Sequence, residues 1–289
     1  TREDHEFALK PMNCPHHVEI YRRKKWSYRE LPQRYASTTK MYRDEQTGEL
    51  AGLARVRSIT IDDAHVFCKL EQVEEEAGRI WDIITEFYRA FDFPLTPRLS
   101  THDPEKMDEY LGTEDDWKKA EDMLRSLVKS RGVKAEEAPG EAAFYGPKID
   151  FVGVDSLGRE WQVATIQLDM NLPERFDLTC VNEKGEGERI VMLHAAIMGS
   201  IERFMAVLIE HFAGAFPLWL SPVQVVVLPI SEGHKEYAKN LVEFLQNINL
   251  TGERWYYRNS KQSGNVPQQK IMILQIGNSK LYTISGIRI

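Results

Sequence analysis

The sequence predicts an α+β fold, in which an antiparallel sheet with its helices is followed by a small α/β domain. Stretches with the apolar spacing of helices are separated by short segments in which polar and apolar residues alternate. Short turns join these segments, and this arrangement favours an antiparallel sheet over a doubly wound parallel one. After residue 221 an almost unbroken apolar run, a helix and further apolar segments follow each other, which is typical of an α/β unit.

Three helices are predicted before residue 221. The first has apolar residues every three or four positions on one face, namely Val73, Ala77, Ile80, Ile84, Phe87 and Phe91. The second runs from about Asp115 to Arg131, and Gly132 is placed to end it in a left-handed conformation. The third follows Gly199, where Ser200 can cap the first turn.

Strands are predicted between these helices. The predicted strands are Phe7 to Leu9, Met41 to Arg43, Val56 to Ile61, Ile149 to Val154, Trp161 to Leu168 and Val191 to His194. The stretch from Asp44 to Leu53 contains Thr47-Gly48 and a second glycine, Gly52, so we expect a long hairpin loop there.

The chain is expected to divide into domains 1-221 and 222-289, because Pro217 and Pro222 frame a linker. In the second domain, Val223 to Ile230 has the composition of a strand covered on both faces. A helix from about Glu232 to Gln246 and strands at Trp255 to Tyr257 and Ile271 to Ile276 are predicted to complete a mainly parallel sheet.

Composition excludes several classes of protein. The 289 residues carry a net charge of −7, which disfavours a surface that binds nucleic acid everywhere but allows a local basic groove. Three cysteines without CxxC spacing favour a reducing compartment. The apolar runs are shorter than the ~20 residues that a membrane span needs, and the charged start is unlike a signal peptide. We therefore expect a cytoplasmic protein that makes no membrane contact. The chain begins with Thr1 and not Met, and a strand is predicted as early as Phe7, so we expect the N-terminus to be cut.

Arginines flank the predicted hairpin loop. Arg43 lies at the end of one strand, and Arg55 and Arg57 lie at the start of the next, so their guanidinium groups can converge on phosphate oxygens. A solvated hairpin with surface ion pairs is the alternative, and the pattern alone favours it. Arg203, in the first turn of the third helix, opposes the helix dipole and so indicates an anionic ligand nearby.

Cys14, His65 and His194 have side chains that bind zinc, but they are far apart in the sequence and show no local metal signature. Their spacing alone favours a buried cysteine and two ordinary histidines. Asp62 and Asp63 precede His65 closely, and such carboxylates suit an ammonium group or the outer ligands of a metal.

Five blocks of the sequence, taken together, resemble threonyl-tRNA synthetases, which are class II aminoacyl-tRNA synthetases. The blocks are Lys10 to Pro15, the arginine hairpin ending in Asp62 to Phe67, Ala143 to Lys148, Gln162 to Asp169, and His194 to Arg203. They occur in order over most of the first 222 residues, and the remainder resembles the anticodon-binding domain of the same enzymes. Because of this resemblance, we no longer interpret the hairpin as merely solvated, or the cysteine and the two histidines as unconnected.

The resemblance implies a class II catalytic domain in residues 1-221, lacking its N-terminal part, with an antiparallel sheet flanked by helices, and an anticodon-binding α/β domain in residues 222-289. The implied enzyme is a threonine–tRNA ligase, which activates L-threonine with ATP to threonyl-adenylate and transfers it to the 3' end of tRNA(Thr). One Zn²⁺ per chain, Mg²⁺ with ATP, and a homodimer of the intact protein are implied as well.

The resemblance also implies roles for individual residues. The ATP-binding positions of the family are matched here by Arg43, Glu45, Arg55, Gln167 and Arg203. The catalytic positions are matched by Arg43, Arg203 and Lys148. Those matching residues around threonine are Asp63, Tyr145 and Gln162, and those matching the zinc ligands are Cys14, His65 and His194. Asn259 and Arg288 match anticodon-contacting positions. A zinc ion with three protein ligands leaves a position that the amino group and hydroxyl of threonine can fill.

Several residues depart from the family pattern. They are His16 in place of glycine, Ile59 in place of an aromatic residue that stacks on adenine, Ile61 in place of glutamine, and Ala195 in place of arginine. These departures support a second hypothesis, in which the chain is a catalytically impaired, synthetase-like paralogue with a tRNA-binding or regulatory role. A synthetase for proline or histidine is a third hypothesis, which is disfavoured because neither amino acid has a hydroxyl group for the metal to select.

Overall fold

The computed structural model describes residues 6–221, 225–229, 233, 235–247, 272–277 and 280–284. The chain forms two compact units, Thr1–Leu208 and Ile209–Ile289. Three predictions, for Trp255 to Tyr257, Asn259 and Arg288, lie outside the described residues. The division into a catalytic and an anticodon-binding domain stays a prediction.

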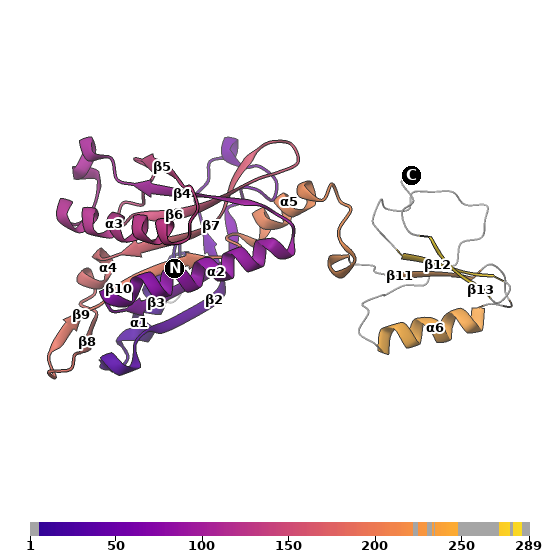
Figure 1. Ribbon diagram of the computed structural model, residues 1–289, viewed down its shortest axis with the longest axis horizontal. Helices are drawn as coiled ribbons and strands as arrows, with labels where there is room; N and C mark the ends of the chain where they lie inside the picture. Colours follow the sequence, from indigo (N-terminus) through magenta and orange to yellow (C-terminus); the bar gives the residue numbers. More distant parts are fainter. Residues whose placement is uncertain are drawn as a thin grey trace. The chain divides into compact units, whose positions relative to one another are not determined.

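Helices and strands are labelled in Figure 1. The α-helices are α1 Cys14–Arg22, α2 Val73–Ala90, α3 Glu114–Ser130, α4 Asn171–Arg175, α5 Ile201–His211 and α6 Lys235–Asn247. The strands are β1 Trp26–Ser27, β2 Gln33–Tyr42, β3 Ser58–Cys68, β4 Leu95–Thr101, β5 Glu136–Pro139, β6 Lys148–Val154, β7 Glu160–Asp169, β8 Thr179–Val181, β9 Gly187–Arg189, β10 Val191–Ala196, β11 Val225–Pro229, β12 Met272–Gly277 and β13 Lys280–Ile284.

A seven-stranded sheet organises the first unit, with the strand order β2-β3-β10-β7-β6-β4-β5. Every neighbouring pair is antiparallel except β4 and β5, which run parallel. The predicted antiparallel sheet is therefore confirmed. A small sheet of order β1-β8-β9 accompanies it.

One face of the large sheet is apolar and covered by helices. Its residues are Val66, Leu99, Ile149, Ile166 and Leu193, all buried. Helix α2 contacts β7 and β10, and α3 contacts β4. The ring of Trp81 on α2 meets the ring of Phe151 on β6 edge to face, with centroids 4.8 Å apart. Burial of this face fixes which residues of each strand point the other way.

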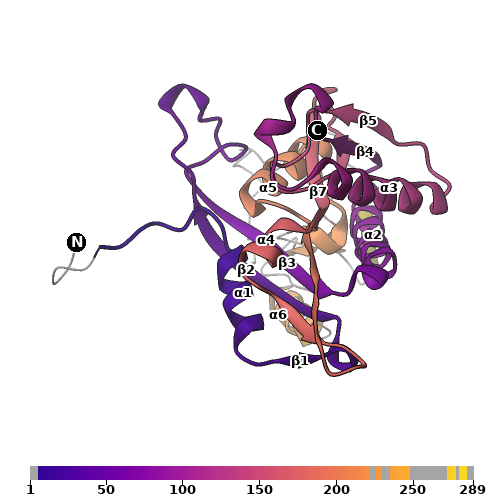
Figure 2. The ribbon, with the colours of Figure 1, turned by 90° about the vertical axis from the view of Figure 1, so that its left-hand side faces the viewer.

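Helix α1 packs against the opposite face. Tyr21 of α1 stacks on Phe67 of β3 with ring centroids 4.7 Å apart, in a cluster that includes Trp26 and Met192. Phe67 follows Val66 directly, so the two side chains lie on opposite faces. Figure 2 shows α1 on one side of β2 and β3, and α2 and α3 on the other.

The three predicted helices are confirmed as α2, α3 and α5. Gly132 adopts the expected positive φ, of 64°, and the Ser200 hydroxyl accepts a hydrogen bond from the backbone N–H of Arg203 (3.3 Å). The three cysteines are free, as expected from the sequence. None of the helices in the described ranges combines the length and hydrophobicity that a bilayer span requires.

The prediction of a strand at Phe7 to Leu9 is wrong. This segment has no regular structure, and 76% of Phe7 and 71% of Leu9 is exposed, because none of the described strands pairs with it and none of the described helices covers it. Strand β4 and helix α1 had not been predicted, and β2 is longer than the predicted Met41 to Arg43. Most of β2 is polar and half exposed, so it carries no apolar alternation.

The second unit contains a sheet of order β11-β12-β13, in which β11 and β12 are parallel and β12 and β13 are antiparallel. The predicted helix is present as α6, and its Ala238 is buried beside Val227 of β11. The prediction of a mainly parallel sheet therefore holds for one of these two pairings.

Gly146 lies where the loop before β6 passes over β7, and it provides a first test of the fold. A Cβ atom there would lie 1.9 Å from the carbonyl oxygen of Leu168, a backbone atom that cannot move alone. We expect Gly146→Ala to lower the free energy of unfolding by about 2 kcal/mol, measured by urea denaturation. Gly187→Ala is the control, because a Cβ at residue 187 would meet nothing within 4 Å, and equal losses in both variants would contradict the account.

Candidate functional site

Strand register collects several predicted site residues into one row across the sheet. His65 of β3 pairs with His194 of β10, His194 pairs with Gln167 of β7, and Gln167 pairs with Lys148 of β6. The row lies on the face opposite α2 and α3, because residues next to it, such as Leu193, face those helices. Side chains that are distant in the sequence therefore meet through the antiparallel pairing alone.

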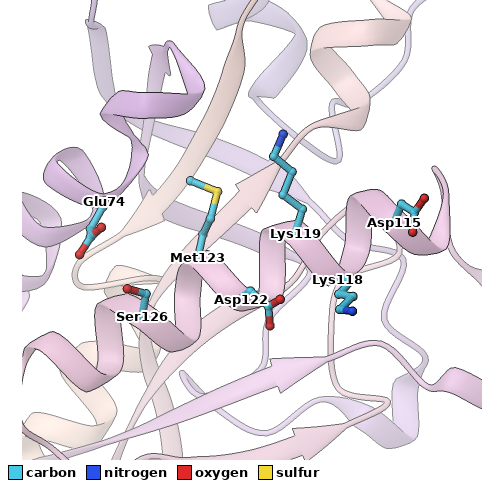
Figure 3. A pocket seen from close by; sticks show the side chains of 7 residues that line it. All are labelled: Glu74, Asp115, Lys118, Lys119, Asp122, Met123 and Ser126. Atoms are coloured by element: carbon cyan, nitrogen blue, oxygen red, sulfur yellow. The ribbon is translucent and has the colours of Figure 1, made fainter.

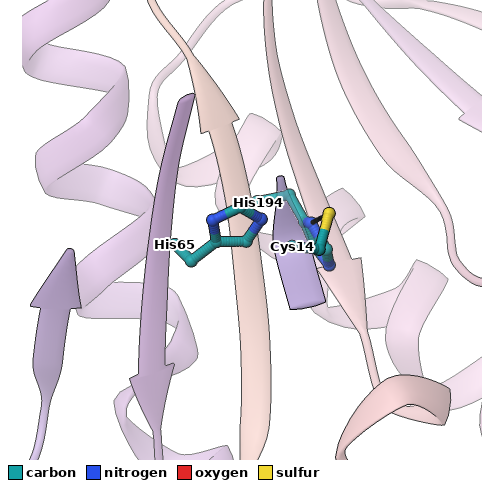
Figure 4. A group of neighbouring side chains, drawn as sticks. All are labelled: Cys14, His65 and His194. Atoms are coloured by element: carbon teal, nitrogen blue, oxygen red, sulfur yellow. Dashed lines mark hydrogen bonds between the residues drawn. The ribbon is translucent and has the colours of Figure 1, made fainter. Parts of the chain in front are cut away.

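Cys14, His65 and His194 form one cluster (Figure 4). The Sγ atom of Cys14, at the start of α1, lies 3.6 Å from Nδ1 of His194, and the two histidine rings have centroids 4.6 Å apart. One ligand atom from each of the three residues lies within 4.8 Å of the others, and all three side chains are buried. A thiolate with two imidazoles is a donor set that zinc prefers.

Neighbouring side chains orient both histidines. Nε2 of His194 lies 2.8 Å from Oδ2 of Asp169, so Nδ1 is the nitrogen that faces Cys14. Nδ1 of His65 lies 2.7 Å from Nδ1 of His17, whose Nε2 lies 3.3 Å from the hydroxyl of Ser37. Nε2 of His65 is buried and has no hydrogen-bond partner among the described residues. An unpartnered ring nitrogen beside a thiol fits a metal ligand, with the other nitrogen held by an outer partner.

Burial sets the protonation states in this cluster. Burial, and then the charges of His194 and His17, lower the pKa of His65 to about 2, so its ring is neutral, as a metal ligand must be. Burial also disfavours a charged His194, but Asp169 and Cys14 outweigh this and raise its pKa, so a metal ion bound here would have to displace a proton from this ring. Burial raises the pKa of Asp63. Its Oδ2 lies 3.7 Å from Nδ1 of His65 and has no hydrogen-bond partner in the described structure. His17, Asp63 and His65 form a second group of potential ligands, which shares His65 with the first.

A pocket of about 380 Å³ lies between β3, β7, the hairpin loop and the start of α5. The predicted residues that line it are Arg43, Glu45, Arg55, Gln162 and Arg203. Ile59 and Ile61, two of the departures from the family pattern, line it as well. Guanidinium groups from two distant segments suit an anionic ligand.

Backbone contacts hold the two arginines in place. The N–H of Arg43, just after β2, donates to the carbonyl of Arg57 (2.8 Å). The Nε of Arg203 donates to the carbonyl of Ala54 in the hairpin loop (3.0 Å). Arg55 pairs with Glu45 (2.8 Å) and Glu49 (3.3 Å). The hairpin therefore contains surface ion pairs and also lines the pocket.

The remaining predicted residues lie next to the metal-ligand cluster. Tyr145 donates its hydroxyl hydrogen bond to Gln167, and its ring centroid lies 5.3 Å from that of His194. Burial raises the pKa of Tyr145, so the phenol stays protonated. Lys148 is paired with Asp150. Unlike Gln162, residues Asp63, Tyr145, Lys148 and Gln167 do not belong to the lining of the arginine pocket.

Several carboxylates that hold the site had not been predicted. Asp169 orients His194, and Asp150 binds Lys148 and Gln162. Asp150 could have been found, because it lies two residues from Lys148 and so shares its face of the strand. Asp169 could not, because its place beside His194 depends on how β7 and β10 pair.

Asp62 and Glu202 join β3 to the start of α5. Oδ2 of Asp62 accepts hydrogen bonds from the backbone N–H groups of Ile197 (2.7 Å) and Met198 (2.9 Å). Both carboxylate oxygens of Glu202 lie within hydrogen-bond distance of the N–H of Thr60, at 3.0 and 2.9 Å. These bonds fix the turn before α5 and thereby the position of Arg203.

Another hollow, of about 510 Å³, lies along α3 and is drawn in Figure 3. Its residues are Glu74, Asp115, Lys118, Lys119, Asp122, Met123 and Ser126. Charges of both signs on one side of a surface helix are typical of a solvated face. Among the described residues, none of the predicted site residues lines this hollow.

The sequence and the fold of this chain are similar to those of known proteins. Residues 1–212 match the family described as tRNA synthetase class II core domain (G, H, P, S and T). The chain is 50% identical over 246 residues to the threonine–tRNA ligase of Flavobacterium johnsoniae, covering 85% of this chain and 38% of that protein. It is 52% identical over 248 residues to the threonine–tRNA ligase of Rubrobacter xylanophilus, covering 86% of this chain and 39% of that protein.

A solved structure is similar as well. It is the RNA binding domain of threonyl-tRNA synthetase from Cryptosporidium parvum Iowa II, with a TM-score of 0.84 and 40% sequence identity. The match covers 96% of this chain and 70% of that one. In contrast, the chain spans only 38 to 39% of the length of the two ligases named above.

Asp62 allows a test of the turn before α5. Burial raises its pKa above 3.8, although hydrogen bonds from Met198 and Ile197 act against this. The folded state thus favours the neutral acid, and the ionised group lowers stability as the pH rises through the folded pKa. We expect Asp62→Asn, which keeps an acceptor, to be at least as stable as the original chain at about pH 7. The difference should shrink as the pH falls through the folded pKa of Asp62 and be smallest below about pH 4.

Asp62→Ala is the matched variant, because it removes the acceptor and leaves the two N–H groups unpaired. We expect it to lose about 2 kcal/mol at every pH. Thermal unfolding across the pH range measures both effects. An Asn variant as unstable as the Ala variant at neutral pH would contradict this account of Asp62.

Proposed function

This chain belongs to the threonyl-tRNA synthetases, within the class II tRNA synthetase core family, and we propose that it activates L-threonine with ATP and transfers it to tRNA(Thr). The observation that carries the proposal is the combination of two neighbouring features on one face of the sheet. One is the pocket lined by Arg43 and Arg203, and the other is the buried cluster of Cys14, His65 and His194.

ATP is proposed to lie in the arginine pocket. The attack of a carboxylate on the α-phosphorus concentrates negative charge, which Arg43, Arg203 and Mg²⁺ bound to ATP would stabilise. The guanidinium group of Arg203 is bound to the carbonyl of Ala54, so its charge is already in place when negative charge develops. The contact of Arg43 fixes its backbone, which donates to the carbonyl of Arg57. Glu45, whose carboxylate is fixed by Arg55, is proposed to recognise the adenine amino group.

Cys14, His65 and His194 are proposed to hold one Zn²⁺. The donor set, the unpartnered Nε2 of His65 and the contact between His194 and Asp169 all fit this ion. When bound, a zinc ion with three protein ligands supplies open coordination positions for the amino group and hydroxyl of threonine. Valine lacks that hydroxyl, so the site would reject it.

The protein's own residues are proposed to complete the threonine site. Asp63 has an unpartnered, buried carboxylate oxygen that can accept from the ammonium or hydroxyl group. Tyr145 is held beside His194 by its hydrogen bond to Gln167. Gln162, whose amide nitrogen is bound by Asp150, is the third residue proposed to contact threonine. Burial excludes water around these groups and strengthens each polar contact.

The remaining partners follow from the family. We propose that residues 222-289, with Asn259 and Arg288, bind the anticodon, that the intact protein is a homodimer, and that it works in the cytoplasm without a membrane. The alternative of an impaired paralogue is supported by Ile59 and Ile61, which line the pocket without an aromatic ring or an amide. Activity measurements distinguish the two.

Threonine-dependent exchange of labelled pyrophosphate into ATP tests the proposal. We expect exchange with threonine, weaker discrimination against serine, and rejection of valine by at least about 10⁴-fold, because valine leaves polar groups unpaired. Arg203→Ala is expected to lower exchange by about 10² to 10³-fold. Arg125→Ala, on the surface of α3, is the control. Binding of ATP and threonine without any exchange would favour the paralogue instead.

Metal analysis tests the cluster independently of activity. We expect about one zinc per chain, and a 10- to 100-fold lower zinc affinity in His17→Ala, because His17 orients His65. Competition with a chromogenic chelator measures the affinity. His16→Ala is the matched control, since His16 is exposed on the same helix turn. Equal affinities in the His17 variant and the original chain would remove His17 from the site.

A further inference from the structure

An irregularity in strand pairing shapes the wall of the arginine pocket. Strands β6 and β7 pair Phe151 with Ala164 and then Val152 with Gln162, so Val163 is an extra residue on β7. In a regular strand, residues 162 and 165 would point to opposite faces. The β-bulge brings Gln162 to the face of Thr165, and both residues line the pocket.

The bulge is held from the helix side. The hydroxyl of Tyr88, on α2, donates a hydrogen bond to the carbonyl of Val163 (3.3 Å). Gly199 lies close to the same carbonyl, since a Cβ at residue 199 would be 3.1 Å from it. A buried backbone group of the extra residue is thereby paired, which stabilises the irregular register.

Asp150 lies directly across from Thr165 and is 3% exposed. Its Oδ1 accepts from Nε2 of Gln162 (2.6 Å) and the hydroxyl of Thr165 (3.0 Å). Its Oδ2 accepts from the hydroxyl of Ser100 (2.9 Å) and from Lys148. Donors from β4, β6 and β7 therefore converge on one buried carboxylate.

This arrangement determines which end of the Gln162 amide is free. An ionised carboxylate only accepts hydrogen bonds, so Gln162 has to present its NH₂ group to Asp150. The carbonyl oxygen Oε1 of Gln162 is then left as the acceptor. Asp150 itself does not belong to the pocket lining, whereas Gln162 does.

We propose that Asp150 is a positioning residue for the amino-acid substrate, acting through Gln162. By holding the amide nitrogen, it keeps Oε1 available to accept from the ammonium or hydroxyl group of the substrate. This inference rests on the proposed function, because it takes an amino acid as the occupant of this part of the site. Lys148 is held by the same carboxylate, so its cation is fixed at the same place.

Asp150→Asn tests the inference, since the new amide offers a donor to Gln162 and permits its amide to turn. We expect the KM for threonine in pyrophosphate exchange to rise by about ten- to a hundredfold, the range for a lost hydrogen bond to a charged group. We expect the KM for ATP to change by less than about threefold, because Arg43 and Arg203 stay in place.

Ser100→Ala is the matched control. It removes a donor from the same carboxylate, but Ser100 is buried and does not line the pocket. We expect it to lower thermal stability without changing the KM for threonine. A KM that rises equally in both variants, or in neither, would overturn the inference.

A double-mutant cycle with Gln162→Ala tests the route of action. If Asp150 acts through Gln162, Asp150→Asn has no further effect on the KM for threonine once Gln162 is alanine. Additive effects would overturn the inference. Should Asp150→Asn fail to fold, Tyr88→Phe is the second variant, because it loosens the bulge while leaving every bond to Asp150. It should raise the same KM by a smaller factor, again only when Gln162 is present.

Calorimetric binding of threonine to the same variants separates the two proposals. An original chain that binds threonine but shows no exchange would refute the proposed activity, while the affinities still test Asp150. An original chain that binds no threonine would refute both. Exchange in the original chain with unchanged KM in Asp150→Asn would refute only the role of Asp150.

Discussion

The hydrogen-bonded register of β3, β10, β7 and β6 is the constraint on which the site depends. It aligns His65, His194, Gln167 and Lys148 in one row. A slip of one residue in β10 would replace His194 on this face by its apolar neighbour Leu193. The register is secured by the opposite face, where apolar side chains are buried under α2 and α3. The hydrophobic core therefore decides which polar groups meet.

Buried and partly buried carboxylates then hold several polar groups of the site in fixed positions. Asp169 holds His194, Asp150 holds Gln162 and Lys148, and Asp62 holds the turn before α5. Each carboxylate accepts at least one hydrogen bond, which offsets part of the free energy of burying its charge. Arg43 and Arg203 line the pocket instead, so positive charge is concentrated where an anionic substrate would bind.

The sequence predicts the elements whose signals are local and misses those that depend on distant partners. Helices α2, α3 and α5 could be predicted because each has an apolar stripe and an end signal that depend only on local spacing. Strand β2 could not, since its exposed polar side chains carry no alternation. The apolar segment Phe7 to Leu9 was wrongly predicted as a strand, because a strand also needs a partner. The sequence spacing of Cys14, His65 and His194 did not predict that they form one cluster, and only the family resemblance connected them. The spacing carries no signal because His65 and His194 meet through the pairing of β3 with β10.

The apolar lining of the pocket explains how departures from the family pattern can coexist with a preserved site. In the proposed ATP site, Ile59 and Ile61 would offer apolar area to a planar base, but no ring to stack on it and no amide to hydrogen-bond a substrate. Orientation then has to come from charged groups that are already fixed. Glu45 is fixed by Arg55, and Arg203 by the carbonyl of Ala54. Since these groups are anchored by contacts that do not involve Ile59 or Ile61, we expect the two isoleucines to weaken ATP or threonine binding without removing the geometry of the pocket.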